Sequence, residues 1–469
     1  MINILISILG TFLLFMNWEN SFLLITVCGF LQDPLRKIIP GEPVFLTTLA
    51  ALCLTAVFVK LKLKRSSPTL LSPFKNQQNI QSVVVTYILI VVIQGILGYL
   101  RYNNPIMLAI GLLSYLIPFP ILWVTWYANK KFLVVINQAK IYVIFGIIVA
   151  FTIFLSYLGF NWKFIQPVGE AMLISSDYGP LLSHSGLMRS GEIATWHIAT
   201  AGSILLGYLI YKNNLIWYTI FLPILGGMFV SGLLTGRRKF IAQIVVFLFV
   251  YLMLYFYFQS KKIVNNNIFY FSFLITGLLT FMYFFPLDLN LISNPNLEPY
   301  LARGQTVVAD DRLVSLGFNS IFWAINRFGY FGIGAGTAGL GMAHFGGVVD
   351  GAGGAGEGGL GKIVVELGIP GLIIIVYLLF KLLWVFWKNL KLSFAVNKGE
   401  FSCLNLIYFS LLIANVPMFI SSSLLFGDLF ILIIIGMFMG NLLGIKRALG
   451  LDSPQQSLIS NKKYTGNFT

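Results

Sequence analysis

The chain has 469 residues, of which 58% are hydrophobic and only 10% are charged. Soluble domains usually carry about a quarter charged residues, so this composition excludes an ordinary soluble globular protein. The formal net charge is +15, but nucleic-acid binding is not indicated, because the basic residues are scattered over short connections and form no patch or stripe.

Apolar segments close to ~20 residues long recur along the chain, and this is the length of helix that crosses the ~30 Å hydrocarbon core of a bilayer. Backbone inside lipid must satisfy its own hydrogen bonds, so these segments are predicted to be helices. The predicted spans are 43–59, 82–100, 105–127, 140–158, 194–211, 215–233, 240–258, 267–285, 363–382, 404–424 and 427–445.

The first apolar stretch, 2–31, is interrupted at Trp18, Glu19 and Asn20. It crosses either once as a broken helix or twice, and one crossing is favoured because each half alone is short for a span. The prediction is therefore an all-α, polytopic membrane protein with about twelve transmembrane helices.

Lysine-rich connections alternate with lysine-poor ones along the chain, so all of them fall on one face, which the positive-inside rule makes cytoplasmic. The connections richest in lysine are 60–80, 128–140, 259–263, 388–398 and the tail 446–469. This topology divides the chain into N-terminal transmembrane helices (1–285), a large extracytoplasmic glycine-rich loop (286–362), C-terminal transmembrane helices (363–445) and a cytoplasmic tail (446–469).

Arginine is distributed in the opposite way, and the positive-inside rule does not explain its distribution. Eight of the ten arginines fall on the extracytoplasmic face. They are Arg36, Arg101, Arg189, Arg237, Arg238, Arg303, Arg312 and Arg327. A guanidinium group binds phosphate oxygens bidentately and never deprotonates. Two readings stay open: ion pairing with carboxylates of the same face, or a site for a phosphate or diphosphate.

The strongest local signal is the run Arg237-Arg238-Lys239 between two apolar spans. The helix that starts near Phe240 directs its N-terminus to the same face, and its dipole favours an anion there. A second charged pair, Arg189 and Glu192, directly precedes another span. It acts either as an interfacial anchor or as a contact to a lipid headgroup.

The glycine-rich run on this face has fifteen glycines in the 33 residues from 329 to 361. Glycine lets the backbone approach a ligand closely, and successive amides can form a nest for an anion; the alternative is a flexible linker. His184, His197 and His344 are placed on the same face or at its outer edge, where histidine can serve as an acid or base. The three cysteines are too widely spaced for a disulfide framework or a zinc site.

Three short stretches resemble motifs of the O-antigen polymerase and ligase family of bacterial membrane glycosyltransferases. They are 189–193, at the entry to a middle helix; 231–238, similar to a Thr/Ser-Gly-x-Arg motif; and 329–371, where the glycine-rich run leads to Glu366-Leu367-Gly368-Ile369-Pro370-Gly371. The hydropathy layout agrees over roughly residues 30–445. The ligase branch typically has a His-Asn pair where this chain reads Glu357-Gly358, which favours the polymerase branch.

The resemblance implies a GT-C-like glycosyltransferase of the bacterial cytoplasmic (inner) membrane that polymerises oligosaccharide units linked to polyprenyl diphosphate. It implies no cofactor and no metal; a chain-length regulator and a flippase are the expected partners, besides the lipid bilayer. The alternatives are an O-antigen-type ligase and a polysaccharide exporter or flippase. The expected catalytic residues are His344, Glu357, Arg237 and Arg238, and the expected substrate-binding residues are Arg189, Glu192, Arg327 and Lys239. Glu192 and Asp33 are further candidates for the base.

Overall fold

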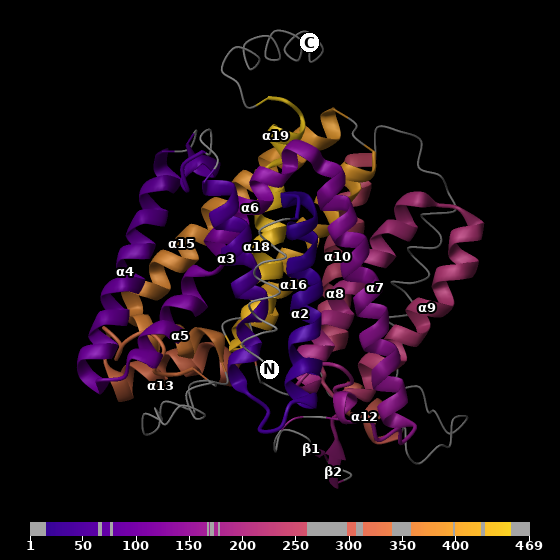
Figure 1. Ribbon diagram of the computed structural model, residues 1–469, viewed down its shortest axis with the longest axis horizontal. Coiled ribbons are helices and arrows are strands. Elements are labelled where there is room, and N and C mark those ends of the chain that lie inside the picture. The colour runs from indigo at the N-terminus through magenta and orange to yellow at the C-terminus, as the bar shows by residue number, and fades with distance from the viewer. Residues whose placement is uncertain are drawn as a thin grey trace.

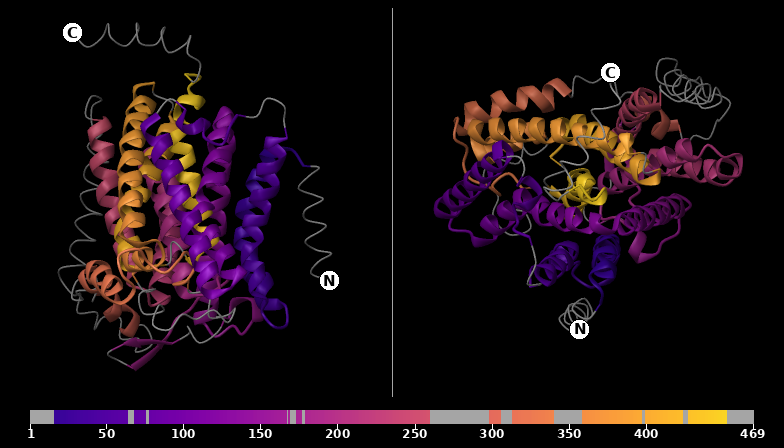
Figure 2. Two further views of the ribbon diagram at one scale, coloured as in Figure 1. Left: turned by 90° about the vertical axis from the view of Figure 1, so that its left-hand side faces the viewer. Right: turned by 90° about the horizontal axis from the view of Figure 1, so that it is seen from above.

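The structure is a computed structural model of the chain, and it describes residues 16–63, 68–75, 78–166, 168, 173–176, 179–259, 298–305, 313–339, 358–396, 399–423 and 427–451. Long helices stand side by side in one bundle (Figures 1 and 2). Within the described residues, eight helical segments are long and apolar enough to cross a membrane. The predicted all-α, polytopic membrane fold is confirmed.

The elements before the first long external connection are α2 (Trp18–Ile38), η1 (Val44–Thr48), α3 (Leu49–Lys62), η2 (Ser72–Phe74), α4 (Gln78–Tyr102), α5 (Pro105–Leu116), α6 (Pro118–Ala128), η3 (Asn129–Lys131) and α7 (Phe132–Tyr157). Helices α5 to α7 run on for 53 residues, far more than one crossing needs. The chain turns back at η3, so the segment crosses twice.

After α7 come η4 (Lys163–Ile165), the antiparallel hairpin of β1 (Leu173–Ser176) and β2 (Gly179–Leu182), α8 (Gly191–Lys212), α9 (Leu215–Leu234) and α10 (Lys239–Gln259). The later elements are α12 (Glu298–Gln305), η6 (Leu313–Phe318), α13 (Asn319–Phe328), α15 (Gly359–Ala395), α16 (Glu400–Ser421), α18 (Leu429–Leu443) and α19 (Ile445–Ala448). The predicted span 267–285 lies outside the described residues.

The first described helix corrects the prediction for the N-terminal region. Helix α2 begins at Trp18 and continues to Ile38 for 21 residues, which is about 30 Å and enough to span by itself. The predicted break at Trp18 is thus a helix start. The predicted stretches 2–31 and 43–59 leave residues 32–42 as a connecting loop, and this prediction is partly wrong, because Asp33, Arg36 and Lys37 lie in the last turns of α2.

Helix α18 is the buried centre of the bundle, enclosed by other helices when seen from above (Figure 2). Its glycines at 436 and 440 lie one helical turn apart and face α6, and its C-cap Gly444 faces Asn129 of η3. A Cβ on Gly440 would lie 2.4 Å from the Leu122 carbonyl oxygen. Small residues at this spacing let two helix backbones approach closely, which is how helices associate within a membrane.

Helix α15 is broken at Gly368, whose φ is 72° and ψ is −177°. The segment after α13 fills the break: the Ile333 N–H donates to the Val365 carbonyl at 2.7 Å, and the Ile369 N–H donates to the Tyr330 carbonyl at 2.8 Å. A Cβ on Gly368 would lie 2.6 Å from the Tyr330 carbonyl oxygen. Glycine is therefore required at position 368, because a side chain there would collide with the backbone at Tyr330.

The described part of the glycine-rich run, 329–339, continues from this break into the space between α4 and α5. The Ala335 N–H donates to the Gln94 carbonyl at 3.1 Å, and Gln94 Nε2 donates to the Phe331 carbonyl at 2.9 Å. A Cβ on Gly336 would lie 2.3 Å from the Met107 carbonyl oxygen. The flexible-linker reading is wrong for these residues, because they are packed between helices.

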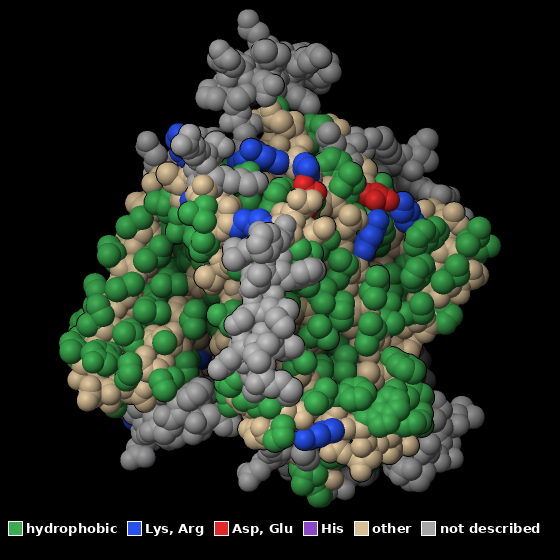
Figure 3. All heavy atoms as spheres, in the orientation of Figure 1, with side chains coloured by type: hydrophobic (Ala, Val, Ile, Leu, Met, Phe, Trp, Pro, Cys, Tyr) green, Lys and Arg blue, Asp and Glu red, His purple; other side chains and the backbone are tan. Residues whose placement is uncertain are grey.

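The two ends of the bundle differ in charge. The lysine end is the one where α3 finishes and α7 begins, and the arginine end is the one where α2 finishes and α8 begins. Figure 3 shows lysine and arginine side chains gathered at the upper rim, which is the lysine end, above a broad hydrophobic band. This separation is expected of helices that cross a membrane in alternating directions.

Candidate functional site

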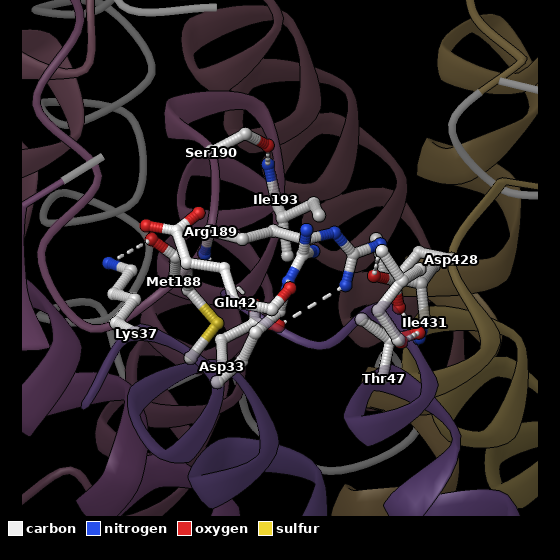
Figure 4. A network of polar contacts seen from close by, with 12 residues as sticks. Asp33, Lys37, Glu42, Thr47, Met188, Arg189, Ser190, Ile193, Asp428 and Ile431 are labelled. Atoms are coloured by element: carbon white, nitrogen blue, oxygen red, sulfur yellow. Dashed lines mark hydrogen bonds and ion pairs between the residues drawn. The ribbon is translucent and has the colours of Figure 1, made fainter. Parts of the chain in front are cut away.

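The arginine end is organised around the start of α8. Ser190 is the N-cap of this helix, and its Oγ accepts a hydrogen bond from the Ile193 N–H at 3.4 Å. Arg189, one residue earlier, donates from its backbone N–H to Asp33 Oδ2 at 2.9 Å and from Nη1 to Asp33 Oδ1 at 3.3 Å. Its Nη2 lies 2.6 Å from Asp428 Oδ2. Two carboxylates therefore hold one guanidinium (Figure 4).

This clamp joins three helices that are far apart in the sequence. Asp33 comes from the last turns of α2, and Asp428 is the N-cap of α18, where its Oδ1 accepts from the Ile431 N–H at 2.8 Å. Both carboxylate side chains are only 1% exposed. Burial by itself would lower the pKa of Arg189, but Asp428 and Asp33 raise it above its ordinary value.

The predicted substrate-binding role of Arg189 must therefore be shared with a structural one. An incoming phosphate would compete with two buried carboxylates for the same guanidinium, so Arg189 chiefly positions α8 against α2 and α18. The sequence reading missed Asp428, although an aspartate directly before an apolar run is a signal for a helix N-cap.

Lys37 is a second residue that the sequence reading missed. Its ammonium group is buried and donates to the Gly186 carbonyl at 2.6 Å and to the Met188 carbonyl at 2.7 Å (Figure 4). It ties the end of α2 to the segment that leads into α8. A lysine on the lysine-poor face was the available signal, and the assignment of 32–42 to a loop concealed it.

A second charged cluster lies one helical turn further along α8. Glu192 Oε1 accepts from Lys239 Nζ and from Ser422 Oγ, the latter at 3.1 Å. Glu192 also interacts electrostatically with Arg237. This cluster joins the starts of α8 and α10 to the end of α16. The structure therefore brings together three predicted site residues, Glu192, Arg237 and Lys239.

The turn before α10 is held in place by hydroxyl groups. Thr195 Oγ1 donates to Thr235 Oγ1 at 2.7 Å, and Ser183 Oγ donates to the Thr235 carbonyl at 2.8 Å. Gly236 follows with a φ of 66°, and a Cβ there would lie 3.1 Å from Ile174 of the hairpin. These contacts fix the position of the turn at Thr235 and Gly236, and therefore the position of Arg237, which follows directly.

Arg237 has the features of an anion-binding side chain. It is partly buried, and its Nε is a buried donor without a hydrogen-bond acceptor among the described residues. A buried donor left unsatisfied costs roughly 1–3 kcal/mol. An anionic ligand at this position would supply the acceptor. Arg238, the next residue, is also partly buried; α10 begins directly after it, at Lys239.

The two described histidines are buried and do not line this cluster. His184 Nδ1 lies 3.0 Å from Ser156 Oγ, and burial lowers the pKa of His184 to about 4. His197 lies inside the bundle, where its Nδ1 is 2.9 Å from the Tyr142 hydroxyl and its ring packs on Phe430. His184 is therefore held neutral, and His197, predicted near the outer edge of its span, is buried inside α8 near the start of that helix.

Several backbone amides of the glycine-rich segment 329–339 are not free to form the predicted anion nest. The amides of Ile333 and Ala335 donate to backbone carbonyls, and the amide of Ala338 donates to Glu366 Oε1 at 3.0 Å. Glu366 is fully buried before the break in α15, and it also accepts from the Tyr115 hydroxyl at 2.5 Å. These amides already have acceptors within the protein.

The remaining predicted residues are not part of the cluster. Arg327 is exposed at the end of α13, where its guanidinium lies 5.7 Å from the Trp323 ring centroid. Helix α13 packs against α15, and Figure 1 shows it on the opposite side of the arginine end from α12 and the hairpin. His344 and Glu357 lie outside the described residues. No group of three or more histidine, cysteine or acidic side chains suited to a metal ion occurs within the described ranges.

No protein-family model matches the chain, and no curated protein matches it either.

Proposed function

We propose that the chain is a glycosyltransferase of the bacterial cytoplasmic membrane that polymerises oligosaccharide repeat units carried on polyprenyl diphosphate. By the positive-inside rule the lysine end is cytoplasmic, so the arginine end faces the other side. The observation that carries the proposal is the gathering of Arg237, Lys239 and the α8 start at that end, where the buried Arg237 Nε has no acceptor among the described residues.

The proposed reaction requires positive charge at this place. The acceptor hydroxyl attacks the anomeric carbon of the donor, the bond from that carbon to the diphosphate oxygen breaks, and polyprenyl diphosphate leaves with the electron pair. Negative charge develops on the leaving oxygen, and preorganised cations directed at it stabilise the transition state. We assign this role to Arg237 and Arg238, which precede the N-terminus of α10, whose dipole has the same sign.

The other charges have supporting roles in this proposal. Glu192 accepts from Lys239 and Ser422 through one carboxylate oxygen, so it holds the lysine beside the diphosphate site. Arg189 positions the α8 start through Asp33 and Asp428. The proton of the acceptor hydroxyl passes to a base, for which His344 and Glu357 remain the sequence-based candidates.

The test is reconstitution of purified protein with defined lipid-linked repeat units, followed by measurement of product length. Arg237→Ala or Arg238→Ala is expected to lower the polymerisation rate about 10²–10³-fold, the usual loss for one charge-stabilising donor. Arg101→Ala is the matched control, because Arg101 is an exposed arginine at the end of α4, at the same end of the bundle. Normal chain length in both cluster variants would refute the assignment.

The same assay separates the alternatives. A ligase would leave finished polymer on the carrier lipid when its site is disabled, whereas a polymerase would leave single repeat units. An exporter would move labelled lipid-linked units across vesicles while no glycosidic bond forms.

A further inference from the structure

The lysine end carries a feature that the proposed reaction does not use. Beyond its break at Gly368, α15 runs to Ala395, about 40 Å at 1.5 Å per residue. The ~20 residues that the hydrocarbon core requires after the break end close to Lys388. Lys388 and Lys391 therefore lie at the membrane–water boundary.

One face of this helix is open to lipid along its whole length. Four apolar side chains spaced three or four residues apart are more than half exposed: Ile373 (63%), Val376 (55%), Phe380 (66%) and Trp384 (54%). Residues three and four apart lie on the same side of a helix. Lys388 and Lys391 continue this spacing, so the apolar face leads directly to two ammonium groups.

Both ammonium groups lie over aromatic rings. Lys388 Nζ is 5.1 Å from the Trp384 ring centroid, and Lys391 Nζ is 4.9 Å from that of Trp387. Lys391 Nζ also lies 6.0 Å from the ring of Tyr257 in α10. An ammonium over a ring keeps its full charge, and the ring limits the positions that the side chain adopts.

These two lysines differ from others at the same end of the bundle. Lys131 is paired with Glu19 and Lys212 with Glu400, both at 2.5 Å. No carboxylate within the described ranges forms an ion pair with Lys388 or Lys391. Within the described residues, no carboxylate therefore neutralises their positive charge, and the boundary position favours an anion that belongs to the membrane.

We propose that the lysine end of α15 binds a phospholipid with an anionic headgroup. Its phosphate contacts Lys388 and Lys391, which are neighbours on the helix surface, and its acyl chain lies along the face from Trp384 towards Ile373. The site binds anionic headgroups in preference to zwitterionic ones, because a zwitterionic headgroup brings its own cation close to the two lysines. Trp384 marks the depth at which the headgroup meets the chain, as aromatic side chains do at membrane interfaces.

The experiment measures lipid binding to the purified full-length chain in detergent by native mass spectrometry. Phosphatidylglycerol is the anionic probe and phosphatidylcholine the zwitterionic one. The wild-type protein is expected to bind phosphatidylglycerol more tightly. The double variant Lys388→Gln/Lys391→Gln is expected to lose about 30-fold in phosphatidylglycerol affinity, from about 1 kcal/mol, or about fivefold, per lysine.

Two further variants make the result specific. Lys75→Gln/Lys140→Gln removes the same charge from exposed lysines at the same end and is expected to change the affinity less than about threefold. Lys388→Arg/Lys391→Arg keeps the charge and is expected to retain binding. An equal loss in the Lys75/Lys140 variant would overturn the proposal. Equal wild-type affinity for the two lipids would also overturn it, and this comparison requires no variant.

Discussion

Replacing Asp428 by asparagine tests the charge clamp at the arginine end. Asp428 Oδ2 lies 2.6 Å from Arg189 Nη2, and the carboxylate is 1% exposed. Asparagine has almost the same volume and is as good an N-cap as aspartate. The change therefore removes one negative charge while leaving the helix cap of α18 in place.

The expected loss follows from the partners that remain. Removing one member of a buried ion pair usually costs about 3–5 kcal/mol when the other charge is left uncompensated. Here Asp33 stays at 3.3 Å from Arg189, so the guanidinium keeps one partner and we expect a loss at or below the lower limit of that range, about 2–3 kcal/mol. Asp428→Ala also loses the hydrogen bond to the Ile431 N–H, and we expect about 1 kcal/mol more.

The assay is reversible unfolding in mixed micelles, with Arg189→Met and the double variant completing a thermodynamic cycle. The double variant should be less destabilised than the sum of the two single variants, because each single change removes the same Arg189–Asp428 interaction and the double variant loses it only once. Glu42→Gln serves as the control, since Glu42 contacts Arg36 through its carbonyl oxygen and not through its carboxylate. Additive effects, or a loss below about 0.5 kcal/mol for Asp428→Asn, would refute the clamp.

Three further outcomes are expected. Burial lowers the pKa of His184 from 6.5 to about 4, so below pH 6.5 the unfolded chain takes up a proton that the folded chain does not. The free energy of unfolding should therefore fall by about 2 kcal/mol between pH 8 and pH 5. His184→Gln should remove this component of the pH dependence of unfolding. Gly336→Ala should destabilise the protein by about 1–3 kcal/mol more than Gly329→Ala, because both glycines have positive φ but only a Cβ on Gly336 meets backbone, at 2.3 Å; equal melting temperatures would contradict the packed segment. Lys37→Met should cost about 2–3 kcal/mol through two lost charge-assisted hydrogen bonds and should expose the segment before α8 to protease, whereas unchanged cleavage would show that Lys37 does not anchor it.

Sequence alone was sufficient for the class of fold and for the two ends of the bundle. The thickness of a membrane sets the length and the apolar composition of each crossing helix. Each segment fulfils this requirement through its own residues, so it can be recognised without knowledge of the rest of the fold. The alternation of lysine-rich connections follows from the same rule. The sequence did not place the helix ends correctly. Helix α2 continues through Asp33, Arg36 and Lys37 because these polar groups find partners in other segments.

The tertiary structure decided which charges meet and what the glycines do. Arg189 lies 156 residues from Asp33, with which it pairs, and no local pattern encodes such a contact. The glycine-rich segment reads as a linker or an anion nest by composition, yet residues 332–339 are packed against α4, α5 and α15. Helix periodicity and hydropathy are local properties of the chain, whereas an ion pair or a backbone approach depends on the distance between segments, which only the folded bundle sets.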